Sequence, residues 1–296
     1  MKDSKSHREF VAGGISSIPR SGIRDFFDIV NQSNDVISLS IGEPDFTAPW
    51  HIREAAIFAL ERGATSYTEN RGTIALRNAI SEYVAESYGP VYDPASEVLV
   101  TVGVSEALDL AFRAVLEPGD EVIYHEPCYV SYSPVISMAG GIPVPAVTNA
   151  EHGFRLTGRM LEEKLSARTK VLLLNFPTNP TGAILSEKDI QEICRFVIEN
   201  DLLLISDEIY SELTYDPGER RSPAAVPDMR ERTIFLNGFS KAWAMTGFRT
   251  GFACAPPEIT EAMMKIHQYT IMCAPVLSQK AAVEALKNGY GDMKTM

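Results

Sequence analysis

Several features that would place a protein in a special class are scarce or absent from this sequence of 296 residues. No run of about 18 apolar residues occurs, which excludes a transmembrane helix. The polar start, MKDSKSHREF, lacks the apolar core of a secretory signal. Basic residues are outnumbered, with 27 Lys and Arg against 39 Asp and Glu and a net charge of −12. Because phosphate contacts need a basic face, we expect no binding to nucleic acid or to an anionic membrane.

Cysteine and histidine are also few and scattered. The four cysteines show neither metal-ligand nor redox-motif spacing, and they lie in or beside apolar runs, which predicts buried, reduced thiols and a cytoplasmic location. They are Cys128, Cys194, Cys254 and Cys273. No two histidines have the i, i+4 spacing of a helical zinc site, so we expect no metal.

Apolar segments of strand length alternate with helical patterns after a mixed N-terminal stretch in which residues 22–31 predict a short helix. Six segments predict strands: Val98–Val102, Glu121–Tyr124, Val171–Leu174, Leu202–Ile205, Thr233–Leu236 and Gly251–Ala253. Helices are expected after Ser105 and Ser186 as N-caps, the latter helix reaching about Glu199, and from Pro257. This order predicts an α/β fold of three αβα layers, in which helices cover both faces of a mostly parallel central sheet.

Ligands of such sheets bind beyond the carboxyl ends of the strands, and two of these ends carry glycine or proline. Gly103–Ser105 follows the first strand at a helix start, where free N–H groups suit an anion, although a plain tight turn is the simpler interpretation. Asn179 lies in a loop stiffened by two prolines and a glycine, which can hold an amide toward a ligand or serve only as a turn.

Two further strand ends carry ionisable groups. Asp207 ends a buried strand and needs a partner, either a cation, a helix N-terminus or a protonated ligand nitrogen, with Tyr210 three residues later. Lys241 lies among apolar and glycine residues that would lower its pKa and make it a nucleophilic amine, although an exposed loop lysine is the usual case. Arg249 suits a phosphate. Together these groups match pyridoxal phosphate, an aldehyde with a phosphate tail and a ring nitrogen.

Four ordered motifs carry a resemblance to a known family: SIGEPDF (40–46), FPTNPTG (176–182), SDEIY (206–210) and FSKAWAMTGFRTG (239–251). From about Gly13 onward the chain resembles the fold-type I, class I/II pyridoxal-phosphate aminotransferases, most closely the prokaryotic aspartate and aromatic subgroup. The resemblance implies that Lys241 forms a Schiff base with the cofactor and moves the proton between the substrate Cα and the cofactor. It also implies that Asp207 pairs with the ring nitrogen, while Tyr210 and Asn179 bind the ring hydroxyl.

Further cofactor and substrate contacts follow from the same resemblance. The phosphate would be held by Arg249, Ser240, Gly103, Val104 and Ser105. Tyr129 would stack on the ring, and Tyr67 would reach the phosphate of the neighbouring subunit in a homodimer. The substrate side would be lined by Gly42, Asn179 and Tyr129.

The sequence also departs from the family pattern. Gly238 stands where many relatives carry a serine or threonine, which removes one phosphate hydroxyl, and Phe248 stands where several carry tryptophan. By resemblance, residues 1–45 form an N-terminal arm and part of the small domain, 46–288 the cofactor-binding large domain, and 289–296 a stub leading to a C-terminal small domain that is missing. That domain supplies the arginine that binds the substrate carboxylate in relatives, so we expect this truncated chain to turn over slowly or not at all.

The function implied is transfer of an amino group between an amino acid and a 2-oxo acid. Three alternatives stay open at this stage. One is another reaction on the same cofactor, such as that of a β-lyase, a decarboxylase or a synthase. Another is a fragment that binds the cofactor without turnover, and the last is a binding module used as a sensor. The sequence does not indicate which amino acid is used.

Overall fold

The computed structural model describes residues 10–19, 42–215 and 222–296, so the predicted helix at 22–31 lies outside the described residues. The helices are α1 (Gly13–Ser16), α3 (Trp50–Glu61), α4 (Ile74–Tyr88), α5 (Gly103–Val115), α6 (Tyr132–Met138), α7 (Gly158–Glu162), α8 (Glu187–Glu199), α9 (Pro257–Thr270), α10 (Val276–Asn288) and α11 (Tyr290–Thr295). The strands are β1 (Val98–Thr101), β2 (Glu121–Glu126), β3 (Ile142–Val147), β4 (Thr169–Leu174), β5 (Leu203–Asp207), β6 (Thr233–Gly238) and β7 (Gly251–Cys254).

The strands form one sheet in the order β1-β7-β6-β5-β4-β2-β3. Every neighbouring pair is parallel except the two that involve β7, which runs antiparallel to both β1 and β6. The mostly parallel sheet is therefore confirmed, and each of the six predicted strands is present within a few residues. The edge strand β3 was not predicted, because its sequence IPVPAV contains two prolines, which a sheet accepts only where their missing N–H groups are not needed.

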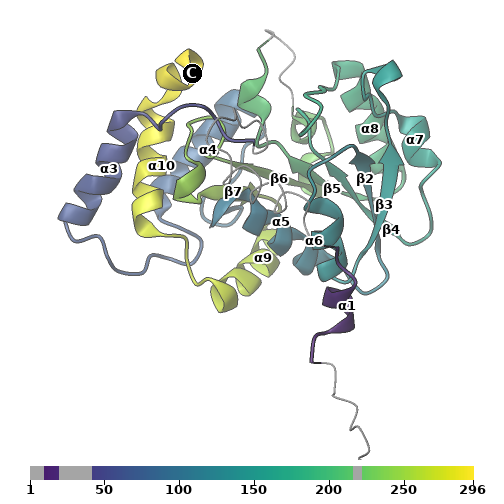
Figure 1. Ribbon diagram of the computed structural model, residues 1–296, viewed down its shortest axis with the longest axis horizontal. Helices are drawn as coiled ribbons and strands as arrows, with labels where there is room; N and C mark the ends of the chain where they lie inside the picture. The colour runs from purple at the N-terminus through teal and green to yellow at the C-terminus, as the bar shows by residue number, and fades with distance from the viewer. Residues whose placement is uncertain (1–9, 20–41, 216–221) are drawn as a thin grey trace, which may run out of the picture.

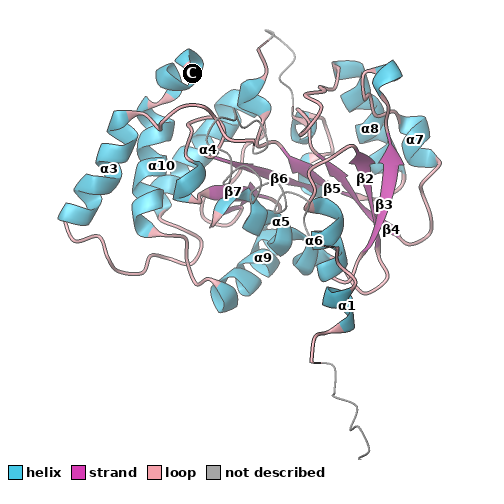
Figure 2. Ribbon diagram, viewed as in Figure 1, coloured by secondary structure: helices cyan, strands magenta, loops and turns pink. Residues whose placement is uncertain are grey.

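Helices cover both faces of the sheet, as the three-layer prediction requires (Figure 2). Alternate residues of a strand point to opposite faces, so Ile234 and Leu236 of β6 pack with α5 and α9, whereas Phe235 between them packs with α4 and α10. At the β4 side of this second face, α7 and α8 complete the layer. Figure 1 shows α5, α6 and α9 together in front of the sheet.

Two of the three expected helix starts are confirmed, and one is wrong. Ser186 caps α8 in a capping box with Asp189, and α9 begins at Pro257. Ser105 does not cap α5, which begins two residues earlier at Gly103. The reason is that Gly103 adopts a φ of 75°, which turns the chain directly from strand into helix, and the backbone N–H of Val102 is accepted by Glu106 instead of by a serine.

The cysteines differ in burial. Cys194 and Cys254 are buried, whereas Cys128 and Cys273 are only half-buried, and all four are free thiols. Among residues 10–19, 42–215 and 222–296, no helix is long and apolar enough to cross a bilayer, and no cluster of three metal-ligating side chains occurs.

Candidate active site

The direction of the strands brings the predicted residues to one edge of the sheet. Because β1, β6, β5, β4 and β2 are mutually parallel, their carboxyl ends meet at the same edge. Asp207 is the last residue of β5 at this edge, and Gly103, Lys241 and Asn179 lie on the segments that follow β1, β6 and β4. Strand β7 runs the opposite way, so that its amino end, just after Arg249, lies at this edge as well. Segments far apart in the sequence therefore meet because of the directions in which the strands run.

Lys241 follows β6 and is half-buried rather than exposed. Its Nζ donates a hydrogen bond to the carbonyl of Gly42 and lies 5.7 Å from the centre of the Tyr210 ring. Burial lowers the pKa of this amine, and the nearby Arg249 lowers it further, while Glu43 acts against both. The pKa therefore moves in the direction that makes a lysine nucleophilic.

Asp207 ends β5 with its carboxyl group buried beneath the edge. One oxygen accepts a hydrogen bond of 2.8 Å from the Tyr132 hydroxyl, and the other accepts one of 3.2 Å from the backbone N–H of Ile209. Burial raises the pKa of the carboxyl to about 6, against the effect of these two donors. Within the described residues no lysine, arginine or histidine forms an ion pair with it. It is thus a buried acid that lacks a cation.

Tyr210 and Asn179 come together over this acid. The Asn179 side-chain amide donates a hydrogen bond of 3.1 Å to the Tyr210 hydroxyl. Asn175, at the end of β4, fixes the arrangement from beneath, because its amide donates to the carbonyl of Asp207 at 2.9 Å while its oxygen accepts from the N–H of Asn179 at 3.2 Å. The loop was expected to be stiff, and it carries cis peptide bonds before both of its prolines.

A second group of residues surrounds the start of α5. A Cβ placed on Gly103 would lie 2.7 Å from Nη2 of Arg249, so the guanidinium rests directly against the glycine. Arg249 itself has a left-handed backbone, with φ 51° and ψ 53°, that turns its side chain toward this helix end. No carbonyl or side chain of the described residues accepts from the N–H groups of Gly103, Val104 or Ser105. Free N–H groups beside a guanidinium suit an anion.

The helix start approaches the sheet closely because two strand positions carry glycine. A Cβ on Gly251 would lie 2.6 Å from backbone atoms of both Gly103 and Val104. A Cβ on Gly238 would lie 3.0 Å from Gly251 Cα and 3.1 Å from a methyl of Val104. The glycine at 238 is thus explained by lack of space, since a serine there would push apart the segments that form the anion site.

The chain is similar to known proteins in sequence and in structure. Residues 34–296 match the family Aminotransferase class I and II. Over 268 residues, 90% of this chain and 69% of the relative, the sequence is 44% identical to the aspartate aminotransferase of Pyrococcus abyssi. The sequence is also 41% identical to aromatic-amino-acid aminotransferase 2 of Thermococcus litoralis, again over 268 residues, 90% of this chain and 69% of the relative. The structure of the aspartate aminotransferase from Thermus thermophilus with maleate superposes with a TM-score of 0.92, at 36% identity over 97% of this chain and 76% of that one.

The chain belongs to the aminotransferase class I and II family. It is an aminotransferase of EC 2.6.1, moves an amino group between an amino acid and a 2-oxo acid, and uses pyridoxal phosphate. The described residues of the aminotransferase fit this cofactor. A buried acid without a cation suits a protonated ring nitrogen, a lysine of lowered pKa suits an aldehyde, and free N–H groups beside Arg249 suit a phosphate.

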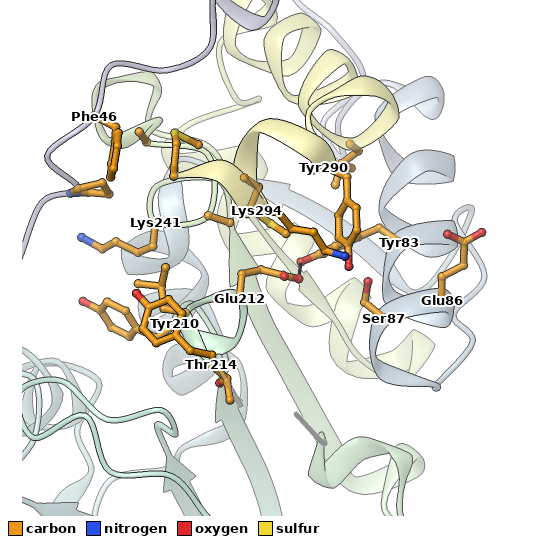
Figure 3. A pocket seen from close by; sticks show the side chains of 18 of the residues that line it. Phe46, Tyr83, Glu86, Ser87, Tyr210, Glu212, Thr214, Lys241, Tyr290 and Lys294 are labelled. Atoms are coloured by element: carbon orange, nitrogen blue, oxygen red, sulfur yellow. Dashed lines mark hydrogen bonds between the residues drawn. The ribbon is translucent and has the colours of Figure 1, made fainter. Parts of the chain in front are cut away.

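A cavity of about 1420 Å³ opens from these residues toward α4 and α11. Lys241, Gly42 and Tyr210 line one end of it, while Tyr83, Glu86 and Tyr290 line the other (Figure 3). The cavity therefore leaves open space beside Lys241 and Gly42. Figure 3 also shows that Glu212 accepts from Tyr83 at the middle of this cavity.

The remaining predicted residues are distributed unevenly. Ser240 is buried beside Lys241, and Tyr129 is half-buried, packed edge-on against Tyr132 with 5.7 Å between ring centres. Tyr67 is not brought to the site of its own chain, because its side chain is 82% exposed and does not line the cavity.

Sequence reasoning missed three residues near the site: Tyr132, Asn175 and Glu106. The first two donate to Asp207, and the third braces the start of α5. Of these, only Asn175 carried a signal, its place directly after a strand.

Proposed function

We propose that Lys241, Asp207 and Tyr210 are the catalytic residues of this aminotransferase. When bound, pyridoxal phosphate supplies an aldehyde that takes up the amino group and a ring that withdraws electrons from the substrate Cα. The single observation that supports the assignment best is the buried carboxyl of Asp207, which lacks a cation within the described residues and lies at the same strand edge as Lys241. A protonated ring nitrogen is the partner that this carboxylate requires.

The roles of the side chains follow from their placement. Asp207 would hold a proton on the ring nitrogen, and Tyr210 with Asn179 would bind the ring hydroxyl oxygen. The Nζ of Lys241, with its lowered pKa, would take the proton from the substrate Cα and deliver it to the cofactor carbon that receives the amino group. Tyr129 would cover the ring face and exclude water.

The phosphate would be bound at the start of α5. Arg249 would pair with it through its guanidinium, and the N–H groups of Gly103, Val104 and Ser105 would donate to its oxygens, with Ser240 beside them. The positive end of a helix of 13 residues adds a favourable field for this anion.

The assignment of Lys241 is tested with Lys241→Ala and, as a matched control, Lys265→Ala on the exposed side of α9. Lys241→Ala is expected to abolish the visible absorbance of the lysine-bound cofactor and the release of 2-oxo acid from an amino acid. Lys265→Ala is expected to change neither. Unchanged absorbance and oxo acid release in Lys241→Ala would overturn the proposal, and release of ammonia with the oxo acid would indicate elimination instead of transfer.

We also propose that the enzyme is a homodimer in which Tyr67 completes the phosphate site of the partner. Tyr67 and Tyr269 are 82% and 86% exposed, and Asn70 ties their segments together by donating a 2.8 Å hydrogen bond to the carbonyl of Met272. Exposed aromatic side chains gathered in this way are typical of an interface.

Mixing two single variants tests the contribution across subunits. Lys241→Ala mixed with Tyr67→Phe would form hybrid dimers in which one of the two sites contains both intact residues. Recovery of cofactor affinity on mixing supports the proposal. If the mixture binds no better than the Tyr67→Phe protein alone, Tyr67 does not act across subunits.

The domain division is part of the same proposal. Residues 46–288 would form the cofactor-binding large domain, residues 1–45 would belong to the N-terminal arm and small domain, and 289–296 would lead to the rest of the small domain. In the structure the last of these segments includes the short helix α11, which packs beside α10. The substrates would be an amino acid and a 2-oxo acid whose side chains enter the cavity beyond Lys241.

A further inference from the structure

A buried hydrogen-bonded pair, Glu106 and His267, lies beside the proposed phosphate site. Glu106, in the first turn of α5, has its side chain 12% exposed, and His267, in the last turn of α9, is fully buried. Their side chains meet at 2.7 Å, between Oε1 of the glutamate and Nδ1 of the histidine. The second oxygen of Glu106 accepts the backbone N–H of Val102, the residue at which β1 turns into α5. One carboxylate therefore joins the turn to a separate helix.

The choice of glutamate leaves the helix start free for a ligand. A serine or aspartate at the N-cap would accept from the second or third N–H of the helix, which are those of Val104 and Ser105. Glu106 instead accepts the N–H of Val102, which precedes the helix, and α5 has no side-chain cap of the usual kind. The three N–H groups that follow stay available. The turn is thus fixed without using the donors that an anion would need.

Within the described residues, the His267 side chain has no second hydrogen-bond partner that would account for its burial. Its Nε2 is one of the few buried polar atoms in the described residues that lack a hydrogen bond. The tautomer with its proton on Nδ1 donates to Glu106 and leaves only an acceptor unpaired. Burying a histidine that makes a single side-chain hydrogen bond is costly. This cost indicates that the role of His267 is its hydrogen bond to Glu106.

The same histidine connects to the segment proposed to form the subunit interface. Its backbone carbonyl accepts from the N–H groups of Ile271 and Met272, at 2.8 and 3.0 Å. The carbonyl of Met272 in turn accepts from Asn70, on the loop that carries Tyr67. The end of α9 therefore lies between the start of α5 and that loop.

We propose that Glu106 and His267 are positioning residues for the cofactor phosphate, which hold the Val102–Ser105 turn so that its free N–H groups converge with Arg249. The inference rests on the proposed function, because it requires the phosphate to bind at this turn. Neither side chain touches the phosphate. Both act through the backbone of the turn, and His267 does so through Glu106.

The negative charge of Glu106 by itself would weaken phosphate binding, whereas its proposed positioning role would strengthen it. A carboxylate one turn into the helix repels a phosphate bound at its N-terminus. If Glu106 acted only through its charge, removing it would tighten phosphate binding. If Glu106 positions the turn, Glu106→Ala weakens binding, whereas Glu106→Gln, which keeps an acceptor for Val102 and can donate to His267, restores it.

The experiment measures dissociation constants for pyridoxal phosphate and for pyridoxal by absorbance titration of the purified cofactor-free protein. Because pyridoxal lacks the phosphate, the ratio of the two constants isolates the phosphate site. The variants are Glu106→Ala, Glu106→Gln, His267→Leu and His267→Gln, with Arg249→Met as the reference for loss of a phosphate contact. Circular dichroism confirms that each variant is folded, and the two glutamine variants preserve the size and hydrogen bonding of the buried pair.

We expect Glu106→Ala and His267→Leu to weaken pyridoxal phosphate binding by about tenfold while the pyridoxal constant stays unchanged. The corresponding glutamine variants should lie within about threefold of the wild type. Tighter or unchanged binding by Glu106→Ala, together with weaker binding by Arg249→Met, would overturn this inference and leave the proposed function intact. An unchanged ratio in Arg249→Met as well would show that the phosphate does not bind at this turn. Equal loss in Glu106→Ala and Glu106→Gln would also overturn it, because the acceptor for the Val102 N–H that glutamine keeps would then make no difference.

Discussion

Replacing the glycines between the sheet and α5 should destabilise the protein in an order set by the available space. Gly238 and Gly251 face each other on β6 and β7, and the start of α5 rests on both. A Cβ at 251 would lie 2.6 Å from two backbone atoms, and one at 238 would lie 3.0 to 3.1 Å from its three nearest neighbours. A Cβ at Gly291, in α11, would meet nothing within 4 Å.

The sign at each position follows from two opposing contributions. Exchange of glycine for alanine stabilises by about 0.4–1 kcal/mol where the backbone allows it, because the unfolded chain loses freedom. Forcing an extra carbon into a packed site costs about 1–3 kcal/mol. The cost exceeds the gain at Gly238 and exceeds it further at Gly251, where backbone atoms must move, whereas only the gain applies at Gly291. Gly238→Ala should therefore lower the unfolding free energy by about 1–2 kcal/mol.

The assay is thermal unfolding of the three alanine variants and of Gly238→Ser, followed by titration with pyridoxal phosphate. We expect the highest melting temperature for Gly291→Ala, a lower one for Gly238→Ala and the lowest for Gly251→Ala, with a difference of roughly 2–4 °C per kcal/mol. Gly238→Ser should bind the cofactor more weakly than the wild type although it adds a hydroxyl, since it displaces Val104. A stable Gly238→Ser protein with tighter cofactor binding would refute the reasoning from space.

Three further variants test other parts of the structure. Burial raises the pKa of Asp207 to about 6 in the folded protein, above its unfolded value, so the cofactor-free protein loses stability as the pH rises from about 4 to 6. Asp207→Asn should remove this loss and raise the unfolding free energy at pH 7 by on the order of 1–3 kcal/mol. Equal pH profiles of the variant and the wild type in urea unfolding would contradict this. Tyr132→Phe removes a donor from that carboxylate, so it should cost about 1–3 kcal/mol at pH 7 and extend the upper end of the same pH window; an unchanged upper end would count against the hydrogen bond. Ser186→Ala opens the capping box of α8 and should cost about 1 kcal/mol without changing cofactor affinity, and a changed affinity would show that α8 supports the site.

The gathering of the site residues was predictable from the sequence because it depends on strand direction. Buried apolar runs indicated a parallel sheet, and a parallel sheet places the residues after its strands at one edge. Lys241, Asp207 and Asn179 were found in this way. Arg249 is at the same edge for a different reason, since it precedes an antiparallel strand. No pattern in the sequence distinguishes that strand from its parallel neighbours.

What the sequence did not reveal depends on contacts between distant segments. The Tyr132 hydroxyl reaches Asp207 across 75 positions of the chain, and His267 reaches Glu106 across 161. Each pair is chosen by helix packing, which leaves no local signal. Ser105 is the opposite case, in which a local signal was present but misleading. Serine is a favoured N-cap residue, yet α5 begins at Gly103 and Glu106 accepts the N–H of Val102. Strand β3 was missed because proline is rare in strands other than those at an edge.

Identifying the lysine that carries the cofactor tests the proposed site most directly. The protein is loaded with pyridoxal phosphate, reduced with sodium borohydride to fix the bond, digested, and its modified peptide is sequenced by mass spectrometry. The structure predicts stoichiometric label on Lys241 and none on exposed lysines such as Lys265. Label on another lysine, or no label on Lys241 in protein that shows the visible absorbance of bound cofactor, would contradict the assignment.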